Sequence, residues 1–334
     1  MMSSKLQQAI AIAAGIAALC APIAGAQAQD TWPNRPIRMI IPTAAGGGSD
    51  VLGRLVASHL GTALGQPVVP DNRPGASGVV GVSAIKAAPA DGYTIGFSNS
   101  SQAVHAPLMQ APAPYDPTRD LDAIAPVNRV LIVLLGHTSM PFRNLRELAE
   151  YARANPGKLS YGSQGSGTLG HFWPEMLKRR EKVDIVHVPY KGAGPVAQAI
   201  MSGEVQVSIS DILVLGGNVD SPKVRILVQL GRQRSARLPN VESVREAGYP
   251  ELADMAADYW YGFIGPRGLP PAIVKRLNEE INRISALPEV LARINAAGNE
   301  RMAVDPAAFS AIIATEHRAS VPLFRELGLT PTGK

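Results

Sequence analysis

One stretch near the amino terminus decides the fold: residues 37–60, with the sequence IRMIIPTAAGGGSDVLGRLVASHL. Four of its first five residues are apolar, which predicts a short buried strand. A proline, three glycines and several small or polar residues follow and predict a turn. From Val51 onward, apolar residues recur at helical spacing. The stretch is therefore a strand, a glycine-rich turn and a helix, the building block of α/β proteins.

The same plan recurs along the chain. Further strands are predicted at 67–69, 93–97, 130–135, 159–161, 185–188, 205–209, 224–230 and 259–264. Further helices are predicted from the loop at 72–78 to Ala87, at 144–155, from the turn at 162–171 to Arg180, and at 195–202, 270–286, 288–296 and 306–327. Because strands alternate with helices, we expect βαβ units and mostly parallel sheets flanked by helices.

The amino terminus has the features of a secretory signal peptide. Residues 1–28 carry one charge, Lys5, then an apolar stretch, and end in Ala-Gln-Ala. This order predicts cleavage after Ala28 and a periplasmic location. The residue before Cys20 is a leucine, which does not favour lipid modification of that cysteine. The predicted mature chain has no cysteine, so its stability must come from a hydrophobic core.

Composition excludes several classes of protein. The chain has 334 residues, 46% of them hydrophobic, which rules out global disorder. Its net charge of +5 is spread along the sequence, so we expect no nucleic-acid binding, whereas a small anionic ligand fits a mild positive balance. The six histidines lack metal-ligand spacing, and no metal site is expected.

Two glycine-rich turns, at 42–50 and 162–171, are the candidate binding elements. Each follows a predicted strand and opens a helix, where free N–H groups and the helix dipole favour an anion. Hydroxyl groups add donors at Ser49, Ser163, Ser166 and Thr168. Ordinary βα turns with glycines for tight packing are the alternative. Two hydroxyl-lined turns in two α/β lobes favour binding in a cleft between the lobes.

The second turn also contains a G-x-G-x-x-G pattern at 165–170. The enzyme alternative is therefore a secreted NAD-dependent dehydrogenase. Such a site needs an acidic residue at the end of the following strand, but Asp184 stands at its beginning. Neither Ser163 nor Ser166 lies in a G-x-S-x-G nucleophile elbow. No catalytic residue is predicted.

Several short motifs carry a resemblance to a known family. They are WPNRPI at 32–37, IPTAAGGGSD at 41–50, NRPGA at 72–76, ADGYT at 90–94, YGS at 161–163, HVPYKG at 187–192, EAGYP at 246–250 and WYG at 260–262. In number and order they resemble the periplasmic solute-binding proteins of tripartite tricarboxylate transporters, also called the Bug family. The resemblance extends over essentially the whole predicted mature chain.

The resemblance implies a two-lobe periplasmic-binding-protein clamshell that closes on a small organic carboxylate and passes it to a membrane permease. It implies neither catalysis nor a cofactor. The expected lobes are 29–129 together with 262–334, and 130–261, with the chain crossing between them near 128–132 and 256–262. A second alternative is a sensor that presents its ligand to a membrane receptor, such as a sensor kinase. The sequence does not distinguish this role from a role in transport.

The family's ligand-binding groups map onto three loops and two further positions. The implied residues are Thr43, Ala44, Ala45, Gly46, Gly47, Ser98, Asn99, Ser100, Ser163, Gly165, Ser166, Gly167, Thr168, Tyr190 and Asp211. Asp211 stands where the family often has an aspartate that faces the cleft. The sequence departs from the family at Thr43, where an aromatic residue is usual, and at His105, where asparagine is common.

Overall fold

The structure of the protein is a computed structural model that describes residues 32–331, apart from 47, 213–220 and 257. The chain divides after Asn34, and the part that begins at Arg35 forms one compact unit. Both β-sheets belong to this unit. The predicted signal peptide and its cleavage site lie outside the described residues.

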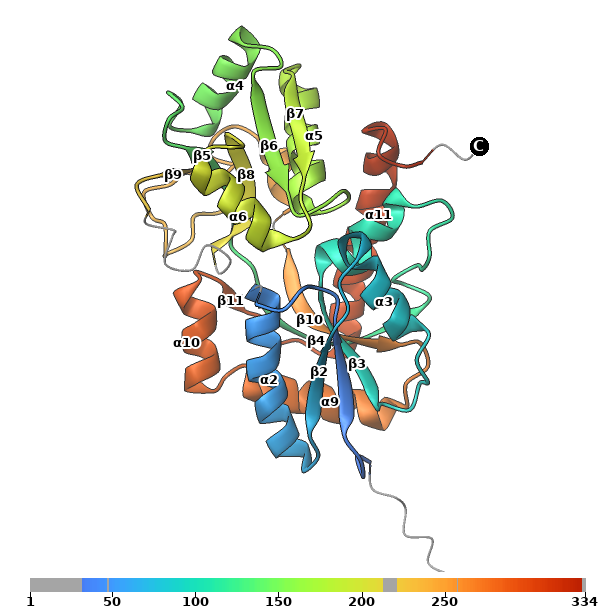
Figure 1. The fold of residues 1–334 in the computed structure, drawn as a ribbon. Coiled ribbons are helices and arrows are strands. Elements are labelled where there is room, and N and C mark those ends of the chain that lie inside the picture. The colour runs from blue at the N-terminus through green and yellow to red at the C-terminus, as the bar shows by residue number, and fades with distance from the viewer. Residues whose placement is uncertain (1–31, 47, 213–220, 257, 332–334) are drawn as a thin grey trace, which may run out of the picture. The chain divides into compact units, whose positions relative to one another are not determined.

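The first sheet has six strands in the order β11-β4-β10-β3-β1-β2 (Figure 1). They are β1 (Ile37–Ile41), β2 (Val68–Asn72), β3 (Thr94–Asn99), β4 (Leu121–Arg129), β10 (Trp260–Pro266) and β11 (Glu300–Arg301). β1 pairs in parallel with β2 and β3. β10 is antiparallel to both of its neighbours, β3 and β4. A strand from the last third of the chain thus lies in the middle of a sheet built mainly from the first 129 residues.

The second sheet has five strands in the order β7-β6-β8-β5-β9. They are β5 (Ile132–His137), β6 (Leu159–Ser163), β7 (Ile185–Pro189), β8 (Val207–Asp211) and β9 (Val224–Gln229). β6 is parallel to β7 and β8, whereas β5 is antiparallel to β8 and β9.

Both sheets are therefore mixed rather than mostly parallel. The antiparallel strand β5 enters the second sheet directly from β4 of the first, and β10 is the strand by which the chain returns to the first sheet. A parallel neighbour needs a crossover connection of a dozen or more residues. Only two residues separate β4 from β5, so no helix intervenes there. The α/β class with two sheets flanked by helices is confirmed.

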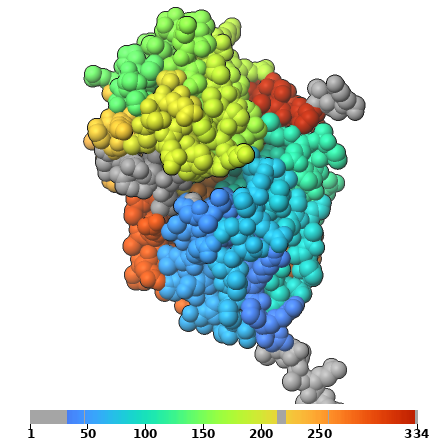
Figure 2. All heavy atoms as spheres, in the orientation of Figure 1, coloured from blue at the N-terminus to red at the C-terminus, as the bar shows by residue number. Residues whose placement is uncertain are grey.

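Helices cover both sheets (Figure 1). With the first sheet are α2 (Gly48–Leu64), α3 (Val79–Lys86), α9 (Pro271–Ile284), α10 (Pro288–Ala296) and α11 (Pro306–Glu326). With the second are α4 (Leu145–Ala154), α5 (Leu169–Glu181), α6 (Ala193–Ser202) and α8 (Pro250–Asp254). The C-terminal helices α9 and α11 both pack on β4. Figure 2 shows yellow-green residues from the part of the chain that contains the second sheet directly against blue and cyan residues from the part that contains β1 to β3.

The core explains the apolar runs in the sequence. Ile37, Met39, Ile40 and Ile41 are completely buried in β1, because helices cover the sheet on which they lie. Trp260 is also completely buried and packs edge-on against Phe309 of α11, with ring centroids 4.8 Å apart. A fully buried aromatic pair of this kind fixes α11 on the first sheet.

Candidate functional site

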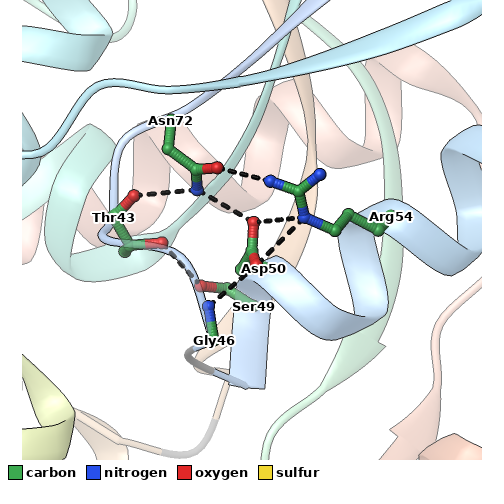
Figure 3. A network of polar contacts seen from close by, with 6 residues as sticks. All are labelled: Thr43, Gly46, Ser49, Asp50, Arg54 and Asn72. Carbon is green, nitrogen blue, oxygen red and sulfur yellow. Dashed lines mark hydrogen bonds and ion pairs between the residues drawn. The ribbon is translucent and has the colours of Figure 1, made fainter.

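The first glycine-rich turn is held in place by Asp50, in the first turn of α2 (Figure 3). The Asp50 carboxylate accepts the Gly46 N–H at 2.9 Å, the Arg54 Nε–H at 3.0 Å and the Asn72 Nδ2–H at 2.8 Å. Burial raises the pKa of Asp50, but the hydrogen bonds from Arg54, Gly46 and Asn72 outweigh it, and the net pKa is below the usual value. Asp50 therefore acts as a charged anchor for the turn.

Asn72, the last residue of β2, connects this anchor to the turn. Its Nδ2 also donates to the Thr43 carbonyl oxygen at 3.0 Å, and its Oδ1 accepts from Arg54 at 2.5 Å. The Thr43 and Ser49 hydroxyls lie 3.3 Å apart (Figure 3). Ala44, Ala45 and Gly46 remain exposed, so their main chain is accessible to a ligand. Gly47 lies outside the described residues.

The sequence predicts a loop from Ser98 onward, but Ser98 and Asn99 are the last two residues of β3, and Ser101–His105 form a short helix. The segment 98–105 is buried, and its polar side chains bind one another. The Ser98 hydroxyl donates to Gln102 Oε1 at 3.1 Å, and Asn99 Oδ1 accepts the Gln102 N–H at 3.0 Å. Gln102 Nε2 in turn donates to the Pro42 carbonyl oxygen at 3.3 Å. Ser100 Oγ accepts the main-chain N–H of Trp260. Gln102 thus connects this segment to the first turn, a role that the sequence did not predict.

The second glycine-rich turn connects β6 to α5. Ser163 is completely buried, and its Oγ lies 2.7 Å from His187 Nε2. The Thr168 hydroxyl donates to the Gly165 carbonyl oxygen at 2.7 Å. The Gly167 N–H donates to His171 Nδ1 at 3.2 Å. Internal hydrogen bonds therefore shape this turn, and Ser166 is the exposed residue at its tip.

The second turn lies against residues that belong with the first sheet. Ser101 Oγ accepts the Leu169 N–H at 3.0 Å, and the Ser77 hydroxyl donates to the Ser166 carbonyl oxygen at 2.8 Å. A side chain at Gly167 would come within 2.7 Å of Met109, so only glycine, here at φ +83°, fits this approach. The structure thus brings together the second turn and the short helix that follows β3.

Asp211 is the last residue of β8, two residues beyond the end of the strand predicted at 205–209. It is buried, and Tyr261 of β10 donates its hydroxyl to Asp211 Oδ2 at 2.8 Å. Burial and the Asp211 charge raise the pKa of Tyr261 well above its usual value. The neighbouring Tyr259 donates its hydroxyl to Ser101 Oγ at 3.1 Å. The sequence predicts the strand at 259–264 but not these two tyrosine contacts.

Tyr190 follows β7 and supports the second turn through its main chain. Its N–H donates to the Ser163 carbonyl oxygen at 2.9 Å. Its hydroxyl donates to Glu204 at 2.6 Å, and burial together with Glu204 raises the pKa of Tyr190 to about 12. The hydroxyl is thus committed to Glu204.

Other kinds of site find little support in the described part of the chain. Its histidines, cysteines and acidic residues form no group of three that could hold a metal ion. None of its helices combines the length and hydropathy needed to cross a bilayer. A cavity of about 520 Å³ beside Lys86 and His317 contains none of the predicted site residues.

Comparison with known proteins identifies the family. Residues 52–329 match the family described as "Tripartite tricarboxylate transporter family receptor". Protein BugT of Bordetella pertussis is 32% identical over 329 residues, which cover 98% of this chain and 99% of BugT.

Solved structures agree. R. palustris Rpa4515 with adipate has a TM-score of 0.83 and 28% identity, covering 90% of this chain and 100% of that one. MatC from Rhodopseudomonas palustris with bound malate has a TM-score of 0.80 and 26% identity, covering 87% and 99%. The chain belongs to the family of tripartite tricarboxylate transporter receptors, the solute-binding proteins that include BugT.

Proposed function

We propose that the protein captures a small organic carboxylate in the periplasm and delivers it to the membrane subunits of a tripartite tricarboxylate-type transporter, without chemical change to the ligand. Similar structures contain adipate and malate, which are both dicarboxylates. The observation that carries the proposal is the contact between Ser101 Oγ and the Leu169 N–H. It places two predicted binding segments, one beside each sheet, within hydrogen-bonding distance of each other.

The second turn supplies the main grip on the ligand carboxylate. The Leu169 N–H at the start of α5 points toward the residues after β3, where Ser101 accepts it, and helix N-termini hold anions without help from a cation. Ala44 to Gly46 of the first turn add accessible main chain from the other sheet. The ligand then contacts both lobes, which we assign to 29–129 with 262–334 and to 130–261. β10 of the first sheet begins at Trp260, so the second crossing precedes that residue, and Trp260 and Tyr261 belong with the first lobe and not the second.

A thermal-shift screen of carboxylates, beginning with adipate and malate, tests the binding function. A ligand at 100 times its dissociation constant stabilises the protein by about 2.7 kcal/mol, which such a screen detects. A protein that unfolds cooperatively but responds to no carboxylate in the panel would contradict the proposal.

The ligand affinities of Ser163→Ala and Thr168→Val, measured by calorimetry, then test whether the second turn supplies the main contacts to the ligand carboxylate. The Ser163 and Thr168 hydroxyls shape the turn through His187 and the Gly165 carbonyl oxygen. An internal hydrogen bond of this kind contributes about 0.5–1.5 kcal/mol, so each change should weaken binding roughly two- to tenfold. Ser58→Ala, on an exposed part of α2, is the matched control. If both variants bind as the wild type does, the first turn becomes the main grip.

The amino terminus of the exported protein tests the location. Mass spectrometry of periplasmic protein should find Gln29 or a neighbouring residue at the start of the mature chain. A lipid-modified Cys20 would contradict the predicted cleavage.

A further inference from the structure

Three stacked rings lie beneath the second glycine-rich turn. Tyr161 of β6 and His187 of β7 are paired across the two parallel strands, with ring centroids 4.8 Å apart and planes 19° apart. His171, in the first turn of α5, stacks on the other face of this arrangement, 4.2 Å from His187 at the same angle. Two imidazoles are therefore in face-to-face contact, which disfavours a positive charge on both.

Each imidazole is hydrogen-bonded to the turn. Because the Gly167 N–H donates to His171 Nδ1, that nitrogen is an acceptor and carries no proton. His171 is thus the neutral Nε2–H tautomer. His187 Nε2 lies 2.7 Å from the Ser163 hydroxyl, at the other end of the turn. The pair holds both ends of the segment from Ser163 to Gly167.

The surroundings keep the pair neutral. The titratable groups that face it are Tyr161 from β6, and Glu175 and Lys178 from α5. Glu175 accepts from the Tyr161 hydroxyl at 2.6 Å and from Lys178 Nζ at 2.8 Å, so its charge is already compensated. Burial lowers the pKa of His171, and burial together with His171 lowers the pKa of His187 to about 4.

We propose that His171 and His187 are positioning residues for ligand binding: as a neutral pair they hold the second turn in its binding geometry, and protonation of the pair in acid releases the turn and the ligand. A proton on His171 Nδ1 would turn the acceptor of the Gly167 N–H into a second donor, and the hydrogen bond would be lost. The inference rests on the proposed function, because it assigns the ligand grip to this turn.

Non-titrating variants provide the test. His171→Asn keeps an acceptor oxygen near the position of Nδ1, and His187→Gln keeps a polar group near the position of Nε2. With adipate and malate as probes, we expect the wild type to lose about tenfold more affinity than the double variant between pH 7 and pH 3, one unit below the pKa of about 4 of His187, a tenfold ratio being 1.4 kcal/mol. Protonation of the probe itself affects both proteins equally, so it cancels in this ratio. His59→Asn, on α2, is the control, and its affinity for the probes should change with pH as that of the wild type does.

His171→Leu tests the acceptor itself. It should weaken binding at pH 7, and His171→Asn should restore it. The proposal would be overturned if the affinities of the wild type and the double variant changed equally with pH. It would also be overturned if His171→Leu bound the probes as tightly as the wild type does.

A ligand-independent measurement separates this inference from the proposed function. Nitrogen-15 spectra at pH 7 should show His171 Nδ1 unprotonated, and the Gly167 amide signal should shift with the His171 titration. A protonated Nδ1 at pH 7 would overturn the positioning role even if carboxylates bind. If these spectra are as expected but no carboxylate perturbs the amide signals of the turn, the proposed function is wrong and the binding part of this inference falls with it.

Discussion

The hydroxyl oxygen of Ser101 lies 3.0 Å from the amide nitrogen of Leu169 and accepts its hydrogen. The first turn of a helix leaves its N–H groups without partners inside the helix. Here one of them, at the start of α5, is satisfied by a residue next to β3 of the other sheet. The same Ser101 oxygen accepts from Tyr259, so one hydroxyl serves two buried donors.

Replacing Ser101 by alanine should therefore destabilise the protein. Leu169 and Tyr259 would both be left with a buried donor lacking its acceptor, at a cost of about 1–3 kcal/mol for an unsatisfied group. Urea unfolding measures the change, with Ser58→Ala as the control. A loss no greater than that of the control would mean that another acceptor replaces the Ser101 oxygen.

Asp211→Asn should change ligand preference. The Asp211 carboxylate can accept from a ligand hydroxyl and repels a second ligand carboxylate, so the wild type should favour malate, which has a hydroxyl, over adipate, which has none. The amide keeps an acceptor for Tyr261 but loses the charge, and the malate preference should fall about tenfold, the effect of 1.4 kcal/mol. Calorimetry with both acids measures this. Unchanged affinities, together with a loss of stability in Tyr261→Phe, would assign Asp211 to holding Tyr261 instead.

The first turn should depend on Asp50 far more than on its ion-pair partner. The Arg54 side chain is 45% exposed, and pairs of this kind contribute about 0–1 kcal/mol, so Arg54→Ala should have a small effect. Asp50→Ala removes the acceptor of Gly46 and Asn72 as well and should cost about 1–3 kcal/mol. Chemical unfolding of the two variants gives the comparison. Equal losses would show that the ion pair, and not the buried acceptor, stabilises the turn.

Glu316 should make the protein less stable in alkaline solution. Trp260 Nε1 donates to its carboxyl group at 3.0 Å, and burial raises the pKa of Glu316 from 4.5 to about 8. The folded state thus keeps a proton that the unfolded state releases, so this contribution to stability is complete below pH 4.5 and is lost as the pH rises through about 8. The Glu316→Gln variant has no ionisable group at this position, so it should lack this decrease in stability with rising pH.

Unfolding free energies at pH 5, 7 and 9 test this prediction. Nearby His105 is completely buried, and burial lowers its pKa to about 3, so it stays neutral at all three values. Parallel pH profiles for wild type and Glu316→Gln would show that Glu316 is ionised in the folded protein.

Local sequence signals predicted the elements of the fold well. The sequence NLRE at 144–147 predicts a capped helix start, with Asn144 as the cap and Glu147 reaching back. In the structure the Glu147 N–H donates to Asn144 Oδ1 at 2.9 Å, and the Glu147 carboxylate accepts the Arg143 N–H at 2.7 Å. β4 was missed, because it contains Pro126, and proline is unusual inside a central strand. The structure accommodates it with register shifts between β4 and β10 on either side of Pro126.

The site was harder to predict than the fold. The hydroxyls of the second turn stand out because glycines surround them, but their partners lie on other elements. Ser77 and Ser166 are 89 positions apart, and no periodicity or motif connects them. His187 belongs to the motif HVPYKG at 187–192, yet its contact with Ser163 depends on the pairing of β6 with β7. Contacts of this kind follow from the topology of the sheet and not from neighbouring residues.

The central position of β10 sets the order in which a nascent chain can complete its sheets. β3 and β4 leave the ribosome early, but the strand that joins them begins only at Trp260. The five strands of the second sheet, within residues 132–229, are all synthesised before that strand exists. Translation therefore completes the later sheet first, and a chain interrupted before Trp260 still lacks the strand that unites the earlier one.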